Sequence, residues 1–192
     1  MDGLLVVDKP SGPTSHDVVA RMRRALRERR IGHTGTLDPM ASGVLPLVIG
    51  RATRLARFMP SDDKRYDAVV RLGWATDTCD AMGRPTGPAW SAELPGRDAI
   101  ATALAQFVGT ALQQPPAYSA KKIAGERSYR LARRRAAGTT GDGPAADDEP
   151  LPAPAMVTAH ELELIAVDGD RLTVRVRCSS GYYVRSLAHD LG

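Results

Sequence analysis

The residue types best suited to chemistry gather in one stretch, residues 30–45, with the sequence RIGHTGTLDPMASGVL. Its three glycines allow close backbone approach or a positive φ, and Pro39 keeps Asp38 out of the α-helical region. The stretch is therefore predicted to be a tightly shaped loop that presents one carboxylate between two apolar segments. An Asp-Pro pair is also a common turn signal, and a turn in which Asp38 bonds its own backbone fits the same spacing.

Other kinds of chemistry find little support in the sequence. The two cysteines, Cys79 and Cys178, form no C-x-x-C pair. The four histidines lack metal-ligand spacing, and no phosphate-binding G-x-x-x-x-G-K-S/T loop is present. We therefore predict a reaction that uses side chains alone, with no metal, nucleotide or redox cofactor. Residues 32–35 also match the short GXXG pattern of RNA-clamping KH loops.

The positive charge of the sequence is concentrated in two blocks. The whole chain has 26 Lys and Arg against 22 Asp and Glu, a net charge of +4. Residues 21–30 hold six arginines and one glutamate, and residues 121–135 hold seven Lys and Arg and one glutamate. By contrast, residues 142–170 hold eight acids and no Lys or Arg. Two basic blocks predict a surface for a polyanion, because Lys and Arg displace counterions from phosphates. Solvated helical faces are the alternative.

The elements that must position these residues alternate between strands and helices. Strands are predicted at 4–8, 44–49, 66–73, 160–167 and 171–178, and helices at 15–29, 51–58, 97–108, 127–137 and 183–190. Residues 171–178 alternate between apolar and polar side chains, as a half-buried strand does, and Asp168-Gly169 before them indicates a hairpin. The first helix has a cap at Thr14 or Ser15 and one apolar stripe. This order favours an α+β fold with a mixed, mainly antiparallel sheet flanked by helices.

The length and composition are those of one soluble globular domain. The chain has 192 residues, of which 43% are hydrophobic and 25% charged. No apolar run approaches the roughly 20 residues that cross a bilayer, and the N-terminus lacks the basic start of a signal peptide. We therefore expect a cytoplasmic protein with no membrane partner. Residues 138–155, rich in Gly, Pro, Ala and Asp, are predicted to form a mobile surface loop within that domain.

Five segments, in order along nearly the whole chain, resemble one enzyme family. Residues 32–55, GHTGTLDPMASGVLPLVIGRATRL, resemble the catalytic loop of the TruB-type tRNA pseudouridine synthases. The other four are similar to that family's opening strand and helix, its tyrosine motif, its Q-x-P-P-x-Y-S-A-x-K segment and its arginine motif. They are GLLVVDKPSGPTSHDVVARMRR at 3–24, KRYDAVVRLGWATDTCDAMGRP at 64–85, QQPPAYSAKKIAGERSYRLAR at 113–133 and GYYVRSLAHDLG at 181–192.

The resemblance implies a reaction and the residues that perform it. Members of the family isomerise uridine 55 in the TΨC loop of tRNA by breaking the N1–C1′ bond, rotating the base and forming a C5–C1′ bond. Asp38 would be the catalytic aspartate, acting as a nucleophile or stabilising oxocarbenium character at C1′. Arg185 would hold Asp38 ionised and oriented. Tyr66 would stack on the flipped-out base and take part in removing the C5 proton.

Five further residues are predicted to contact the RNA, His33 because it resembles the family's histidine that holds the rearranged T-loop. They are His33, Lys9, Tyr118, Lys121 and Tyr183. Structural alternatives stay open: Tyr66 as a core tyrosine, Arg185 as a surface arginine early in a helix, and His33 as a loop histidine with satisfied hydrogen bonds. Asp77 and Asp80 could form an acid–base pair, but they fit a turn with side-chain-to-backbone bonds more readily.

The resemblance also sets expectations about partners and length. The start of the chain and the lack of long basic tails favour the bacterial stand-alone type, so we expect a monomer that acts on the tRNA T-arm with no obligatory protein partner. Family members normally continue past the arginine motif, so the sequence to Gly192 is expected to lack the end of the catalytic domain and a C-terminal PUA domain. Two other functions stay open: a non-catalytic module that grips the T-arm, and a nucleoside hydrolase that releases free uracil.

Overall fold

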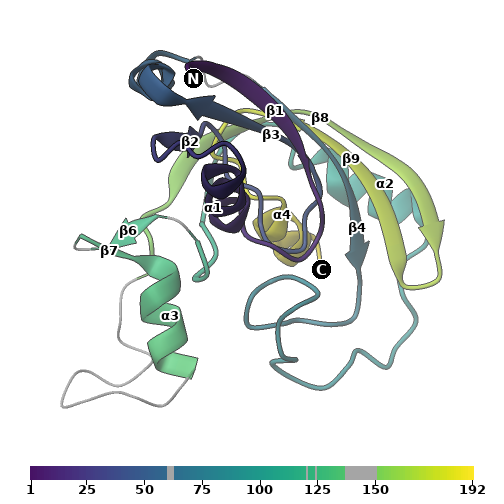
Figure 1. Cartoon of the computed structure of the whole chain (residues 1–192). Coiled ribbons are helices and arrows are strands. Elements are labelled where there is room, and N and C mark those ends of the chain that lie inside the picture. Colours follow the sequence, from purple (N-terminus) through teal and green to yellow (C-terminus); the bar gives the residue numbers. More distant parts are fainter. Residues whose placement is uncertain (60–62, 120, 124, 137–150) are drawn as a thin grey trace. The chain divides into compact units, whose positions relative to one another are not determined.

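The structure, a computed structural model, describes residues 1–59, 63–119, 121–123, 125–136 and 151–192 (Figure 1). They belong to two compact units, residues 1–61 and 62–192. Helices and antiparallel sheets make up both units, which confirms the predicted α+β class. The predicted mobile loop at 138–155 lies mostly outside the described residues, so its mobility stays a prediction.

The first unit is a three-stranded antiparallel sheet covered by a helix. Its strands are β1 (Gly3–Lys9), β2 (Ile31–His33) and β3 (Gly43–Ile49), with β3 in the centre, and its helices are α1 (Ser15–Ala25) and the 3₁₀ helix η1 (Gly50–Phe58). Thr14 caps α1, because its Oγ1 accepts from the Asp17 N–H while the Asp17 carboxylate accepts from the Thr14 N–H. The apolar stripe of α1 packs on the sheet, as predicted. The buried core residues are Val18, Val19, Ile31, Leu45, Leu47 and Ile49.

Three elements of the first unit differ from the prediction. The helix α1 ends at Ala25 rather than at residue 29, because Arg27 has a φ of 51°, outside the right-handed helical region. The helix predicted at 51–58 is a 3₁₀ helix that begins at Gly50. The strand β2 has only three residues, too few for the hydrophobic pattern to predict it.

The second unit is a four-stranded antiparallel sheet in the order β4-β9-β8-β5, and Figure 1 shows β4, β9 and β8 side by side. The strands are β4 (Lys64–Arg71), β5 (Gly109–Gln113), β8 (Ala155–Asp168) and β9 (Arg171–Cys178), and the helices are α2 (Arg97–Ala105), α3 (Ser128–Ala136) and α4 (Val184–Leu191). β6 (Lys122–Ile123) and β7 (Glu126–Arg127) form a small separate hairpin. Residues of α2 and α4 pack with the inward residues of β9 in one core.

The strand β9 supplies four of the buried residues of that core. The alternation predicted at 171–178 is confirmed, since one set of side chains is at most 1% exposed while the three arginines on the other face are exposed. The buried set is Leu172, Val174, Val176 and Cys178. The predicted hairpin is also confirmed, with Gly169 at a φ of 57° in the turn between β8 and β9. β5 is an edge strand with mostly exposed side chains, and no alternation in its sequence predicts it.

Candidate active site

The loop that carries Asp38 joins β2 to β3 in the first unit. On one side of Asp38, Leu37 donates its N–H to Ser15 Oγ and accepts from it through its carbonyl, both at 3.0 Å. On the other side, the Pro39 carbonyl accepts from the Gly12 N–H at 2.8 Å. Ser15 is the buried first residue of α1, so the helix start and the loop before it fix the backbone on both sides of a half-buried Asp38. The predicted tightly shaped loop is therefore present.

Lys9 supports this loop from beneath. Its side chain is 0% exposed, and its Nζ donates to the carbonyls of Pro10 (2.9 Å), Pro13 (2.8 Å) and Pro39 (3.2 Å). Burial lowers the pKa of the ammonium group, and the nearby Asp38 carboxylate opposes that shift. The prediction that Lys9 contacts RNA is wrong in this structure, because a buried ammonium bonded to three carbonyls has no proton to offer a phosphate. Lys9 ends β1, where strand alternation turns it inward.

Replacing Lys9 by methionine is expected to lower the free energy of unfolding by about 3 kcal/mol, because three buried carbonyls lose a charged donor. Urea unfolding measures the change, and Lys121→Met, at an exposed lysine, should stay within about 0.5 kcal/mol of wild type. Because burial lowers the folded-state pKa of Lys9, the unfolded state binds more protons between that value and 10.5. The stability gap between wild type and Lys9→Met should therefore widen as pH rises through this range. A gap that narrows would contradict this account of Lys9.

Arg185 occupies the second residue of α4 in the second unit, and its side chain is only 10% exposed. Its Nη1 donates to the Thr78 carbonyl at 3.0 Å, and its Nη2 donates to the Tyr118 carbonyl at 2.9 Å. The Asp80 carboxylate, also 10% exposed, lies 3.8 Å from Nη1. The alternative of a surface arginine is therefore wrong. The guanidinium group is fixed by two carbonyls and faces a buried carboxylate.

Asp80 itself closes a turn that the sequence predicted. Its Oδ1 accepts from Thr78 Oγ1 at 2.7 Å and from the Met82 N–H at 2.9 Å, while its N–H donates to Thr76 Oγ1. The Asp77 carboxylate accepts from the Arg84 N–H at 2.8 Å. These side-chain-to-backbone bonds confirm the turn interpretation of the two aspartates. The contact of Asp80 with Arg185 is a second role that the sequence pattern did not reveal.

Tyr66 lies on β4, paired with Val176 of β9, and its half-buried side chain packs against the core of the second unit. It also lines a shallow hollow with Arg65, Asp67 and Arg175. Arg175 donates to both oxygens of Asp67, at 2.8 and 3.2 Å, and this hydrogen bonding lowers the pKa of Asp67. Tyr66 therefore packs against the core without being fully buried, and its stacking role stays a prediction.

The remaining predicted RNA contacts fall in different surroundings. Tyr118 is half-buried and donates its hydroxyl to the Ala132 carbonyl of α3 at 3.4 Å, while Lys121 is exposed. Tyr183 precedes α4, and His33 ends β2. In the second unit the structure brings Tyr118 and Arg185 together, and in the first unit Lys9 and Asp38. The pairing of Asp38 with Arg185 joins residues of different units and stays a prediction.

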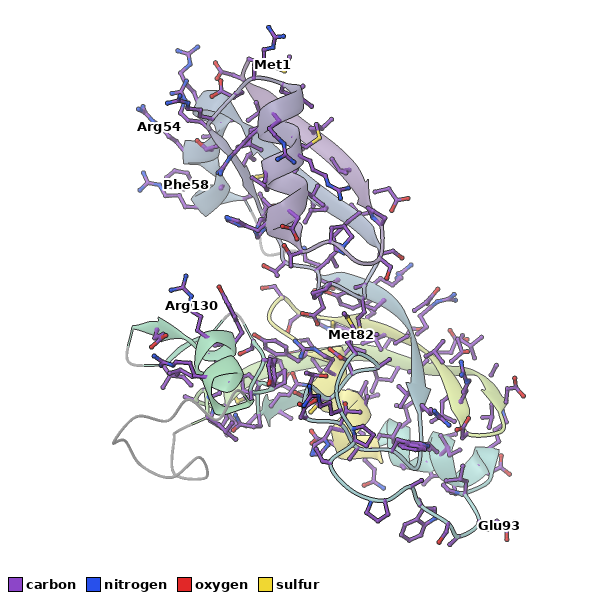
Figure 2. The ribbon with its side chains drawn as sticks, turned by 60° about the horizontal axis from the view of Figure 1, so that its bottom comes forward. Met1, Arg54, Phe58, Met82, Glu93 and Arg130 are labelled. Carbon is purple, nitrogen blue, oxygen red and sulfur yellow. The ribbon has the colours of Figure 1, made fainter. Side chains whose placement is uncertain are left out.

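The helix η1 also carries arginines that the sequence analysis missed. The first unit as a whole holds ten Lys and Arg against five Asp and Glu, a net charge of +5, and six of these are the arginines of the predicted block 21–30, whereas the second unit has a net charge of −1. Three exposed arginines follow η1 at the 3₁₀ spacing of three residues, namely Arg51, Arg54 and Arg57, and we call them the η1 arginine face. Figure 2 shows Arg54 and Phe58 projecting from η1, and the Arg57 guanidinium lies 4.6 Å from the Phe58 ring centroid.

The described residues hold neither a metal cluster nor a membrane-spanning helix. Among residues 1–59, 63–119, 121–123, 125–136 and 151–192, no group of three or more His, Cys, Asp or Glu side chains could bind a metal ion. In the same part of the chain, no helix has the length and apolar character that crossing a membrane requires.

The sequence was also compared with known protein families. The model of the TruB family of pseudouridylate synthases, N-terminal domain, matches residues 23–184, most of the chain. This chain belongs to the TruB family. The resemblance stated from its five segments is thereby confirmed, and the matched range includes Asp38 and Tyr66.

Curated relatives and solved structures agree with this assignment. The chain is 47% identical to tRNA pseudouridine synthase B of Solibacter usitatus over 192 residues, which cover 100% of this chain and 61% of the relative. It is 47% identical to that of Gloeobacter violaceus, with 62% of the relative covered. A Cbf5-Nop10-Gar1 complex has a chain with a TM-score of 0.68 and 28% identity, covering 99% of this chain and 43% of that chain. This TruB-family chain thus spans about three fifths of the length of those curated relatives.

Proposed function

We propose that this TruB-family chain catalyses the isomerisation of uridine 55 to pseudouridine in the TΨC loop of tRNA. Relatives that are 47% identical over the whole chain are named tRNA pseudouridine synthase B, which supports tRNA as the substrate. The observation that carries the proposal is the loop of Asp38. Its backbone is fixed on both sides, by Ser15 at Leu37 and by Gly12 and Lys9 at Pro39. A carboxylate held in this way suits chemistry at a sugar carbon.

The reaction is an isomerisation, so its atoms balance without a co-reactant. The N1–C1′ bond breaks, the base turns and C5 bonds to C1′. C5 loses its proton to water, and N1, freed from the ribose, takes one up. Asp38 would attack the base or C1′, or stabilise positive charge at C1′, during this exchange. Because a stacked uridine is out of reach, it must flip out at a cost of a few kcal/mol. Stacking on Tyr66 would return about 1–3 kcal/mol, and Tyr66 would take part in removing the C5 proton.

Arg185 would serve as the fixed cation of the site. Its guanidinium is buried and already bound to the Thr78 and Tyr118 carbonyls, so it would meet the Asp38 carboxylate without further ordering. We propose further that the protein acts as a cytoplasmic monomer without an obligatory protein partner. Of the predicted RNA contacts, His33, Tyr118, Lys121 and Tyr183 are kept in this proposal. Lys9 is not kept, because its ammonium group is buried.

The proposal is tested with an unmodified tRNA transcript incubated with the protein, digested to nucleosides and assayed for pseudouridine. The expected yield approaches one pseudouridine per transcript. A second transcript, with cytidine in place of uridine 55, should contain none. No pseudouridine in the first transcript would contradict the reaction, and equal amounts in both would contradict the position.

The η1 arginine face is expected to contact tRNA phosphates. Replacing Arg54 and Arg57 together by glutamine should weaken binding and reduce the slope of log K against log salt by about 0.7–0.9 for each phosphate that is no longer neutralised. The matched control replaces Arg84 and Arg171 by glutamine, two exposed arginines of the second unit. Filter binding across a salt series measures both slopes. Equal slopes for the two double variants would contradict an RNA contact at η1.

A further inference from the structure

The end of strand β5 is bonded directly to the start of helix α4. The side chain of Gln113, the last residue of β5, is 8% exposed. Its Oε1 accepts from the Tyr183 N–H at 2.8 Å, and its Nε2 donates to the Tyr183 carbonyl at 3.0 Å. One side-chain amide therefore bonds both backbone groups of the residue that precedes α4. Because both bonds are made by the same planar group, they fix the orientation of the Tyr183 backbone as well as its position.

Two further bonds join the same segments. Ser186, in the first turn of α4, donates its Oγ to the Gln114 carbonyl at 2.7 Å, and it is buried. Arg185 donates to the Tyr118 carbonyl at 2.9 Å. The segment 113–118 thus bonds three residues at the start of α4, namely 183, 185 and 186. The first turn of α4 has its position set by this segment.

The N-cap residue of α4 does not cap the helix itself. Its N-cap residue, Tyr183, has an extended backbone with φ −108° and ψ 108° and makes no capping bond with its own side chain. The first turn of a helix has N–H groups without partners inside the helix, so an outside partner decides how that turn is held. Gln113 supplies this partner from a strand that is 70 residues away in sequence.

We propose that Gln113 is a positioning residue that sets the place of the Arg185 guanidinium in the reaction. This inference rests on the proposed function. Arg185 is two residues past the clamped Tyr183, so a change in the first turn of α4 moves its backbone directly. A displacement of about 1 Å at a catalytic group can cost about 10²-fold in rate. Removal of the Gln113 amide is therefore expected to lower kcat more than it changes KM.

Gln114 is a matched control on the next residue. Its Nε2 donates to the carbonyls of Pro115 and Pro152, and no bond of its side chain to α4 is found among the described residues. The Gln114 carbonyl that accepts from Ser186 belongs to the backbone and is kept in any substitution. Gln114→Leu therefore removes two side-chain amide bonds at an exposed residue without removing the clamp on Tyr183.

The test compares Gln113→Leu, Gln113→Glu and Gln114→Leu by single-turnover pseudouridine formation and tRNA binding. Gln113→Leu should lose about 10²-fold in kcat with KM within about threefold, as for a misplaced catalytic group, and Gln114→Leu should stay close to wild type. In Gln113→Glu the ionised carboxylate cannot donate to the Tyr183 carbonyl, but its protonated form can. Its activity relative to wild type should therefore rise as pH falls. A purely structural residue would show no such recovery.

A second readout does not depend on turnover. The Arg185 Nε–Hε signal, identified by its absence in Arg185→Lys, should shift in Gln113→Leu and stay in place in Gln114→Leu. If Gln113→Leu does not fold, the pH series of Gln113→Glu carries the test. An active wild type with unchanged kcat in Gln113→Leu, or with no pH recovery in Gln113→Glu, would overturn this inference alone. A wild type that forms no pseudouridine would overturn the proposed function together with it.

Discussion

Replacing Asp38 by asparagine is expected to reduce pseudouridine formation by at least about 10⁴-fold, the size of loss found when a reacting carboxylate is removed. Affinity for tRNA should stay within about threefold, because phosphate contacts dominate binding. Asparagine fits the same space, and the substitution leaves the backbone bonds of Leu37 and Pro39 in place. The variant should therefore be folded, bind tRNA and leave its uridine unchanged.

The control for this variant is Asp8→Asn, which makes the same chemical change at an exposed position of β1 in the same unit. Its rate and affinity should match those of wild type. Quantifying pseudouridine after single-turnover incubation gives both rates on one scale. An Asp38→Asn protein that forms pseudouridine as fast as Asp8→Asn would contradict the role of Asp38, and the chain would then be an RNA-binding module or use another residue.

Arg185→Lys is expected to lose about 10²–10³-fold in kcat, comparable to the removal of one preorganised donor from an active site. An ammonium group keeps the positive charge but lacks the planar fork that donates to the Thr78 and Tyr118 carbonyls together. The distance and direction of the positive charge from the Asp80 carboxylate would also change. The loss should appear in kcat, measured at saturating tRNA, with a smaller change in KM.

Arg175→Lys gives the matched comparison. Arg175 also donates through two nitrogens, to Asp67, but this pair lies exposed on the outer face of the sheet. Exposed ion pairs contribute little to stability, so this variant should differ little from wild type in stability. Equal losses of kcat in Arg185→Lys and Arg175→Lys would show that Arg185 has no special part in the reaction.

The sequence predicted best those features that depend on local pattern. The alternation at 171–178 indicated the boundaries and the buried face of β9, because side chains on a strand change face at every residue. The Asp38 loop was predictable for a similar reason, since Gly and Pro restrict the backbone at known positions. The turn at Asp77 and Asp80 was also predictable, because aspartate and threonine side chains readily form hydrogen bonds with nearby backbone groups.

Features that depend on distant contacts could not be predicted in this way. Lys9 is predicted to meet phosphate as a loop lysine, whereas its ammonium group bonds the carbonyls of Pro13 and Pro39, which the local sequence does not reveal. The Gln113 amide bonds a residue 70 positions away, and a contact between such distant residues cannot be predicted from a local sequence pattern. The η1 arginine face depends on η1 being a 3₁₀ helix, with three residues per turn. The sequence predicts a helix at 51–58 but not its 3₁₀ type. The one sequence signal for this face is the three-residue spacing of Arg51, Arg54 and Arg57.

The most direct test of the account is tritium release from a T-arm transcript that carries 5-tritiated uridine. The proposed rearrangement releases the C5 hydrogen and ends with the base joined to its ribose through C5. We predict one equivalent of tritium released to water per transcript, no free uracil, and no release with Asp38→Asn. Free uracil would instead identify a hydrolase, and a wild-type protein that binds the transcript but releases no tritium would contradict the catalytic assignment.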